Sequence, residues 1–162
     1  QVARKRGGRS LRLSTRVPGS LVECRNVGLD PRTWVENDSI DYLTVGDYNF
    51  TDPHLPIEEF SDFTQGTGCR LFFQMGDMIG GAHRGKPDVR PERAGACLPT
   101  QGYISALNTK AEARGAALNA YSQGAEGVSF WNITCSMGDN KSDEDKQRML
   151  GWVEQVLSLI HI

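Results

Sequence analysis

Short apolar runs alternate with longer amphipathic stretches along this chain of 162 residues. The apolar runs are rich in β-branched, aromatic and leucine residues, and they predict strands over residues 11–17, 40–46, 69–75 and 127–131. A helical pattern follows each run. This alternation indicates βα units that build a parallel sheet.

Start and stop signals delimit the helices between these strands. Ser20 is a good cap for a short helix that runs through Val27, and Gly28 is placed to end it. Asp30 followed by Pro31 starts a second short helix, in the preferred order of cap and then proline. Further helices are predicted over residues 57–65, 102–123 and 142–156.

Helical spacing predicts which faces of the two longer helices are buried. The first has an apolar stripe that we expect to face the core, made by Ile104, Leu107, Ala111, Leu118 and Tyr121. The last helix is expected to start after a Ser142 cap, with Asp145 as a weak capping-box partner. Its inner side is expected to bury Met149, Leu150, Trp152, Val153 and Val156. Residues 76–100 form a loop rich in Gly, Pro and Arg, and loops of that length are usually functional or disordered.

The spacing of the units predicts the architecture. Four βα units in this chain average about 40 residues each, as in a (β/α)8 barrel. We therefore predict an α/β fold, a partial (β/α)8 TIM barrel of about four βα units with a parallel sheet. Such a half barrel would have two unpaired sheet edges. A doubly wound sheet of four or five strands is the alternative, but no Gly-rich phosphate loop follows any strand.

The ends of the chain differ from its middle. Residues 1–10 carry a basic cluster among glycines, and we expect them to be a solvated or disordered lead-in to the barrel segment, residues 11–156. The last residues, 157–162, end in LSLIHI and are expected to be a non-native tail that resembles a translated sequencing adaptor. Because the chain starts at Gln1 rather than at Met, we expect the true N-terminus to precede it.

Composition excludes several classes of partner. The net charge of −2 argues against a nucleic-acid surface. No run approaches the roughly 20 apolar residues that span a bilayer. The four cysteines lie far apart without zinc-ligand spacing, so we expect structural thiols at Cys24, Cys69, Cys97 and Cys135. No metal site is predicted at His54, His83 or His161, and no cofactor is expected. The compartment stays open, a secreted or periplasmic location included.

Three stretches in order resemble the glycosyl-hydrolase-like family ten group of bacterial barrels. They are STRVPGSLVECRNVGLDPRTWVENDSIDYLTVGDYNF, EEFSDFTQGTGCRLFFQM and KAEARGAALNAYSQGAEGVSFWN, and together the resemblance covers residues 11–156. The resemblance implies that the four strands are numbers five to eight of a barrel. It implies a carbohydrate substrate, and as partner the missing N-terminal half of the same barrel. In related barrel hydrolases a key acid stands at the end of strand four, which this chain does not include.

In such barrels the chemistry lies at the carboxyl ends of the strands, whereas the opposite rim maintains the fold. Asp41 and Glu126 stand at strand starts, so we assign both to structure. Arg16 ends strand five and is expected either to clamp a substrate hydroxyl or carboxylate or to form an ion pair at the rim. Asp47 follows strand six and is the best-placed carboxylate for acid/base catalysis, with a turn-capping aspartate as the alternative.

Several neighbours of these residues suit sugar binding. Tyr48 is expected to stack on a sugar ring and Asn49 to bind hydroxyls. Trp131 ends strand eight and is expected either to floor a sugar subsite or to be a core residue. Asn132 is expected to bind a hydroxyl or to support a residue that does.

Gln74 departs from the pattern of retaining barrel glycosidases. It closes strand seven, where those enzymes carry a nucleophilic glutamate. An amide can hydrogen-bond to substrate but cannot attack it. Asp77 would replace the missing carboxylate only if its loop folds inward.

Two functions remain open from the sequence. The first is glycoside hydrolysis by Asp47 together with an acid from the missing half. The second is carbohydrate binding without catalysis, which Gln74 favours. A weaker third option is an unrelated α/β enzyme with a nucleotide-type ligand, which the missing glycine loop disfavours.

Overall fold

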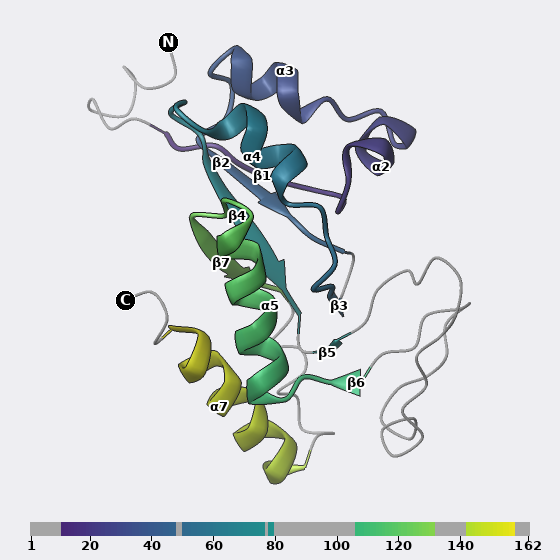
Figure 1. Ribbon diagram of the computed structural model, residues 1–162, viewed down its shortest axis with the longest axis vertical. Coiled ribbons are helices and arrows are strands. Elements are labelled where there is room, and N and C mark those ends of the chain that lie inside the picture. The colour runs from purple at the N-terminus through teal and green to yellow at the C-terminus, as the bar shows by residue number, and fades with distance from the viewer. Residues whose placement is uncertain (1–10, 48–49, 77, 80–105, 132–141, 158–162) are drawn as a thin grey trace.

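A computed structural model describes residues 11–47, 50–76, 78–79, 106–131 and 142–157. Its main sheet has four parallel strands: β1 (Ser14–Val17), β2 (Tyr42–Val45), β4 (Arg70–Met75) and β7 (Gly127–Phe130). Each lies inside one of the four predicted runs. The predicted α/β class with a parallel sheet is therefore confirmed (Figure 1).

The strands follow one another across the sheet in the order in which they occur along the chain, β1-β2-β4-β7. A doubly wound sheet reverses direction at a switch point. Among the described strands of the main sheet there is no such reversal, so the doubly wound alternative is not the observed arrangement.

The short helices begin and end where the capping signals predicted. Helix α2 spans Leu21–Asn26, and the Ser20 side chain accepts a hydrogen bond from the backbone N–H of Glu23. Gly28 follows it with a φ of +79°, a conformation that favours glycine. Helix α3 spans Pro31–Glu36 and is capped by Asp30. Helix α4 spans Glu58–Thr64, inside the predicted range.

Helix α5 is shorter than predicted, because it spans Lys110–Ser122. Thr109 and Glu112 form a capping box that sets its start. The two residues Ala106–Leu107, predicted to be helical, form a strand instead, and residues 102–105 lie outside the described part.

The predicted core face of α5 is wrong at two of the three side chains that the structure describes. Leu118 is 47% exposed and Ala111 is exposed, whereas Tyr121 is partly buried against the core, as predicted. The buried side chains are Ala113, Ala116, Ala117 and Ala120. Alanine side chains are small, so they allow α5 to lie close to the sheet and to α7. This close packing decides which face of α5 is buried, whereas the larger side chains of the helix do not. Ile104 and the side chain of Leu107 are outside the description.

Helix α7 spans Asp143–Leu157, starts directly after Ser142 as predicted, and packs along α5. Val156 is fully buried and Val153 partly buried, in agreement with the prediction. Leu150 is 41% exposed, so its predicted burial is wrong. The side chains of Asp145, Met149 and Trp152 lie outside the description.

The two faces of the main sheet differ in chemistry because side chains alternate along each strand. One face carries apolar side chains that join the helices in a single core: Val17, Leu43, Val45, Leu71, Phe73 and Met75. Helices α4 and α5 lie over the sheet on this side (Figure 1). We call the opposite side the open face, because no described helix packs on it. It carries Arg16, Thr44, Gly46, Phe72, Gln74, Ser129 and Trp131.

A second, small sheet was not predicted. Its strands are β3 (Phe50–Thr51), β5 (Met78–Ile79) and β6 (Ala106–Leu107). It lies just past the ends of β2 and β4 in sequence, and β5 falls in the stretch predicted to be all loop. A buried hydrogen-bond cluster ties it to the main sheet, because Thr51 and Asn108 both bond the Gly76 carbonyl. A strand of two residues is too short to be recognised from residue propensities. These three short strands therefore depend on tertiary contacts.

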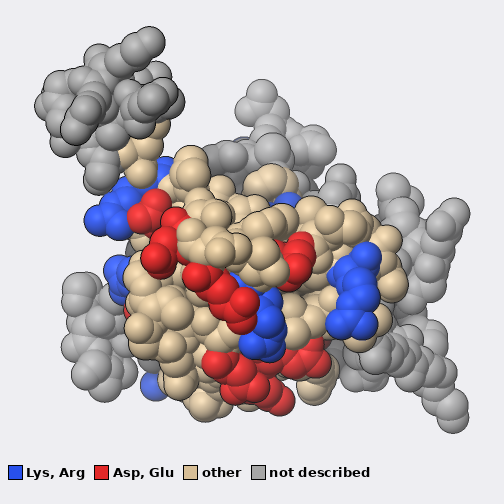
Figure 2. All heavy atoms as spheres, turned by 90° about the horizontal axis from the view of Figure 1, so that it is seen from above, with Lys and Arg blue, Asp and Glu red and all other residues tan. Residues whose placement is uncertain are grey.

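The surface in Figure 2 carries Asp and Glu side chains among scattered Lys and Arg side chains, without a continuous basic area on that face. None of the helices in the described part is long and apolar enough to cross a membrane.

Candidate functional site

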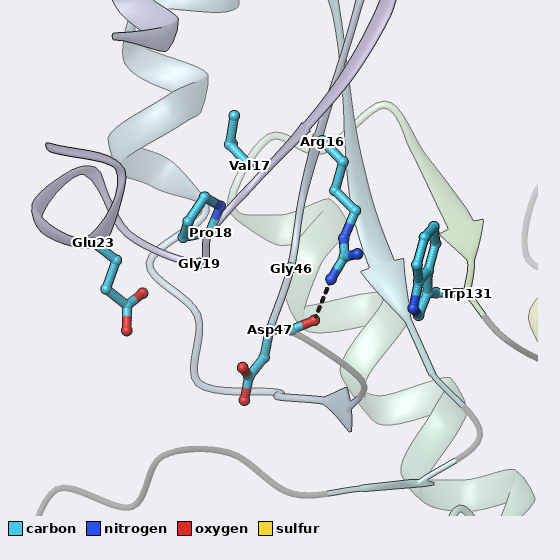
Figure 3. A pocket seen from close by; sticks show the side chains of 8 residues that line it. All are labelled: Arg16, Val17, Pro18, Gly19, Glu23, Gly46, Asp47 and Trp131. Atoms are coloured by element: carbon cyan, nitrogen blue, oxygen red, sulfur yellow. Dashed lines mark hydrogen bonds between the residues drawn. The ribbon is translucent and has the colours of Figure 1, made fainter. Parts of the chain in front are cut away.

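A cavity of about 410 Å³ opens at the carboxyl ends of the main-sheet strands (Figure 3). It is lined by Arg16, Val17, Pro18, Gly19, Glu23, Gly46, Asp47 and Trp131. These residues end β1, β2 and β7 or lie directly after them, apart from Glu23, which belongs to α2. The carboxyl edge of a parallel α/β sheet is where ligands usually bind.

Two glycines of the cavity lining, Gly19 and Gly46, lie close to side chains from other parts of the chain. A Cβ at Gly46 would overlap the Cβ of Gln74 and lie 2.9 Å from its side-chain amide carbon. A Cβ at Gly19 would overlap the end of the Leu55 side chain. Gly46 therefore needs glycine for the close approach of β2 to β4, whereas an overlap at Gly19 would involve only the end of the Leu55 side chain.

Arg16 and Trp131 meet above the open face. The guanidinium carbon of Arg16 lies 4.2 Å from the centroid of the Trp131 ring, a cation–π contact. Figure 3 shows the two side chains side by side, one from β1 and the other from the residue after β7. Trp131 is 39% exposed, so it is not a core tryptophan.

This contact reports the shape of the sheet. Through Thr44 and Phe72, the strand register places Arg16 level with Gly127, four residues before Trp131. In a flat sheet the two Cα atoms would be about 14 Å apart across the strands and about 13 Å apart along them. That separation exceeds the reach of the two side chains. The sheet is therefore not flat, and its twist and curvature together bring the two side chains into contact over the open face.

Asp47 is held by its backbone from two sides. Its carbonyl oxygen accepts a hydrogen bond from Arg16 Nη2 at 3.2 Å and from Gln74 Nε2 at 2.6 Å. The first donor comes from β1 and the second from β4, the two strands that flank β2. In Figure 3 the Asp47 carboxylate points away from Arg16, while its carbonyl faces the guanidinium. The carboxylate therefore forms part of the cavity wall rather than an ion pair with the Arg16 side chain.

Gln74 lies beside the cavity rather than in its lining. Its side chain is 1% exposed, and its amide oxygen has no hydrogen-bond partner among the described residues. The amide nitrogen, by contrast, makes the short bond to Asp47. Contact with substrate was predicted for this residue, but in the described structure its bonded neighbour is the Asp47 backbone.

Glu23 is a cavity residue that sequence reasoning missed. It stands in the first turn of α2, and its carboxylate accepts a hydrogen bond from Ser20 Oγ at 3.0 Å. A signal was present, because a helix that directly follows a parallel strand starts at the carboxyl edge of the sheet. The acidic residue three positions after the Ser20 cap therefore had to lie near that edge.

The structure brings together three of the predicted site residues, Arg16, Asp47 and Trp131, and places Gln74 next to them. The other predicted ligands lie outside the described residues: Tyr48, Asn49, Asp77 and Asn132.

The two carboxylates assigned to structure do make structural contacts. Asp41 pairs with Arg12 at 2.6 Å and accepts the backbone N–H of Leu13. These bonds, that from Leu13 first, hold the pKa of Asp41 below its ordinary value. Glu126 pairs with Arg70 at 3.2 Å and accepts the backbone N–H of Leu71. Both lie at strand starts, on the rim opposite the cavity.

Metal-binding and thiol chemistry receive no support in the described part of the chain. No group of three or more His, Cys, Asp or Glu side chains there could hold a metal ion. His54 is exposed and follows an Asp52 turn. His83 and His161, with Cys97 and Cys135, lie outside the description. Cys24 and Cys69 are free and buried, and burial raises the pKa of Cys24 to about 11, which disfavours the reactive thiolate.

Comparison with models of known protein families, and with curated proteins, finds no match to this chain.

Proposed function

We propose that this chain is the second half of a carbohydrate-active (β/α)8 barrel, and that its cavity binds a sugar for glycosidic bond hydrolysis. Asp47 would act there as an acid/base carboxylate. The observation that carries the proposal is that a carboxylate and a partly exposed tryptophan line one cavity at the carboxyl edge of a curved parallel sheet.

The barrel part of the proposal is supported by topology. The described strands of the main sheet follow chain order, and right-handed crossovers between such strands place the connecting helices on one face of the sheet. The sheet is not flat, and its twist and curvature bring Arg16 and Trp131 into contact over the other face. A barrel wall has both properties, and its open face would be the barrel interior. Four further strands would pair with the free edges of β1 and β7, and they would come from the missing N-terminal half.

The sugar part of the proposal is supported by the cavity lining. An indole face packs well against the C–H face of a pyranose ring, while carboxylates accept hydrogen bonds from hydroxyl groups. Glycoside hydrolysis normally needs two carboxylates. Asp47 would be one, and the other is expected at the end of strand four, outside this chain. The carboxylate of Glu23 also lines the cavity.

Carbohydrate binding without hydrolysis is the second candidate, and Gln74 favours it. With β4 as strand seven of the proposed barrel, this buried amide would take the place of the nucleophile of retaining enzymes. Because its N–H donates to the Asp47 carbonyl, it serves the fold of the site rather than attack on a sugar.

Asp47→Asn and Trp131→Ala, made in the protein completed with its upstream half, separate these functions. For a hydrolase, Asp47→Asn should lower kcat at least a hundredfold while leaving glycan affinity within a few-fold. Trp131→Ala should weaken binding of the same glycans. Glu126→Gln, on the opposite rim, is the matched control and should change neither.

Each outcome selects one function. Glycan binding without cleavage in the unmodified protein selects the binding role. Cleavage that survives Asp47→Asn removes Asp47 from catalysis. An unmodified protein that neither binds nor cleaves glycans contradicts the proposal as a whole.

A further inference from the structure

We propose that Gln74 is a positioning residue, which together with Arg16 fixes the peptide carbonyl of Asp47 and so holds the backbone from which the Asp47 carboxylate projects. This inference rests on the proposed function of Asp47, but its physical core concerns only the backbone at Asp47. It assigns Gln74 a different role from direct contact with substrate.

The Asp47 carbonyl lies just beyond the part of β2 that the sheet holds. The last register pair of β2 with β4 is Val45 with Phe73, and Gly46 N–H still bonds the Val17 carbonyl at 3.3 Å. At the next residue the side chains of Arg16 and Gln74 provide the donors. A carbonyl oxygen has two lone pairs, so it can accept both bonds at once.

Holding this carbonyl restricts the main chain at Asp47. The two hydrogen bonds fix the rotation about the Cα–C bond, while β2 holds the preceding residues, so the backbone from which the Asp47 side chain projects keeps one conformation. Figure 3 shows the result, with the carbonyl toward Arg16 and the carboxylate on the other side of the backbone. Loss of either donor would remove one of these two constraints on the Asp47 carbonyl.

The environment of Gln74 suits a rigid donor. Its side chain is 1% exposed and lies against Gly46, where any larger residue would displace it. Its amide oxygen is buried without a partner in the described part of the chain. A buried acceptor without a partner costs stability, so an apolar side chain of the same shape would serve the fold alone better. The Gln74 N–H group, by contrast, bonds the Asp47 carbonyl, which an apolar side chain could not do.

Gln74→Met tests this role, because methionine keeps the length of the side chain and removes both N–H donors. The first measurement is the backbone ¹³C′ chemical shift of Asp47 in the labelled 162-residue chain. Loss of the hydrogen bond should move this shift upfield. The second is the kinetics of glycan hydrolysis in the completed protein, where we expect kcat to fall at least tenfold with KM within twofold.

Asn108→Leu is the matched control. Like Gln74, Asn108 is a buried amide of the described part of the chain, and its side chain is 1% exposed. Its Nδ2 group also donates to a backbone carbonyl, that of Gly76, at 2.8 Å. Its replacement should lower the thermal midpoint of unfolding about as much as Gln74→Met does. It should leave the Asp47 ¹³C′ shift unchanged.

The outcomes are distinct. An unchanged Asp47 ¹³C′ shift in folded Gln74→Met overturns the proposal, as does a moved shift with unchanged kcat. If Gln74→Met does not fold, Gln74→Leu, which also removes both N–H donors, replaces it, and the same two results decide. The Asp47 ¹³C′ shift could also move in Gln74→Met while the unmodified completed protein hydrolyses no glycan. That result would support the hydrogen bond from Gln74 to the Asp47 carbonyl and contradict only the proposed function.

Discussion

Arg16 and Trp131 are in contact although they come from opposite edge strands of the main sheet. The guanidinium carbon of Arg16 lies 4.2 Å from the centroid of the Trp131 ring, and both residues line the cavity. Because two other strands lie between them, the contact depends on the twist and curvature of the whole sheet rather than on any local turn.

A double-mutant cycle should measure this contact. Arg16→Met and Trp131→Leu, alone and together, should give a coupling free energy of about 0.5–2 kcal/mol in urea unfolding, as for a partly desolvated cation–π pair. Arg12→Met is the control, since Arg12 pairs with Asp41 at the other rim. Its cycle with Trp131→Leu should give a coupling near zero. Equal coupling for both arginines would contradict a specific contact.

Gly46→Ala should damage the site by sterics alone. The added Cβ would overlap the Gln74 side chain, which is buried and has no room to move away. We expect a loss of about 1–3 kcal/mol in the free energy of unfolding, as for overpacking in a core. Gly68→Ala is the matched control, because no atom lies within 4 Å of a Cβ there. Comparable losses in the two variants would show that the Gly46–Gln74 packing is unimportant.

Asp41→Asn should destabilise the chain only where the carboxylate is ionised. The folded state lowers the pKa of Asp41, so its contribution is complete above the ordinary carboxyl pKa of about 3.9. That contribution is lost as pH falls through the lower, folded-state pKa. Urea midpoints should therefore differ between the two proteins at pH 7 and converge at strongly acidic pH. A difference that stays constant with pH would contradict the assignment. The control variant is Asp52→Asn, whose urea midpoints are measured over the same pH range, because Asp52 accepts only the His54 backbone N–H of an exposed turn among the bonds described.

Much of the fold could be predicted because its signals are local. Ser20, Asp30 and Gly28 act within one helical turn, so their identities placed the ends of α2 and α3. Alternating apolar runs located the four strands for the same reason. Helix α5 could not be predicted in the same way. Its buried face consists of alanines, which carry almost no periodic hydrophobic signal, and Leu118 points to solvent.

The candidate site could be predicted only in part. The rule that chemistry lies at carboxyl strand ends selected Arg16, Asp47 and Trp131, and all three line one cavity. It did not select Glu23, which comes from a helix. It also did not predict the bond between the Gln74 N–H and the Asp47 carbonyl, because no sequence signal indicates that this group reaches the backbone after the neighbouring strand.

The sequence by itself determined the types and order of the elements and which polar residues end the strands, because capping and side-chain alternation act over a few residues. Only the tertiary structure decided that the strands keep chain order and that Arg16 reaches Trp131 across a curved sheet. It also decided that Arg16 and Gln74 share the Asp47 carbonyl. Register, curvature and close approach at Gly46 arise from packing between distant segments, and the local pattern of residues does not encode them.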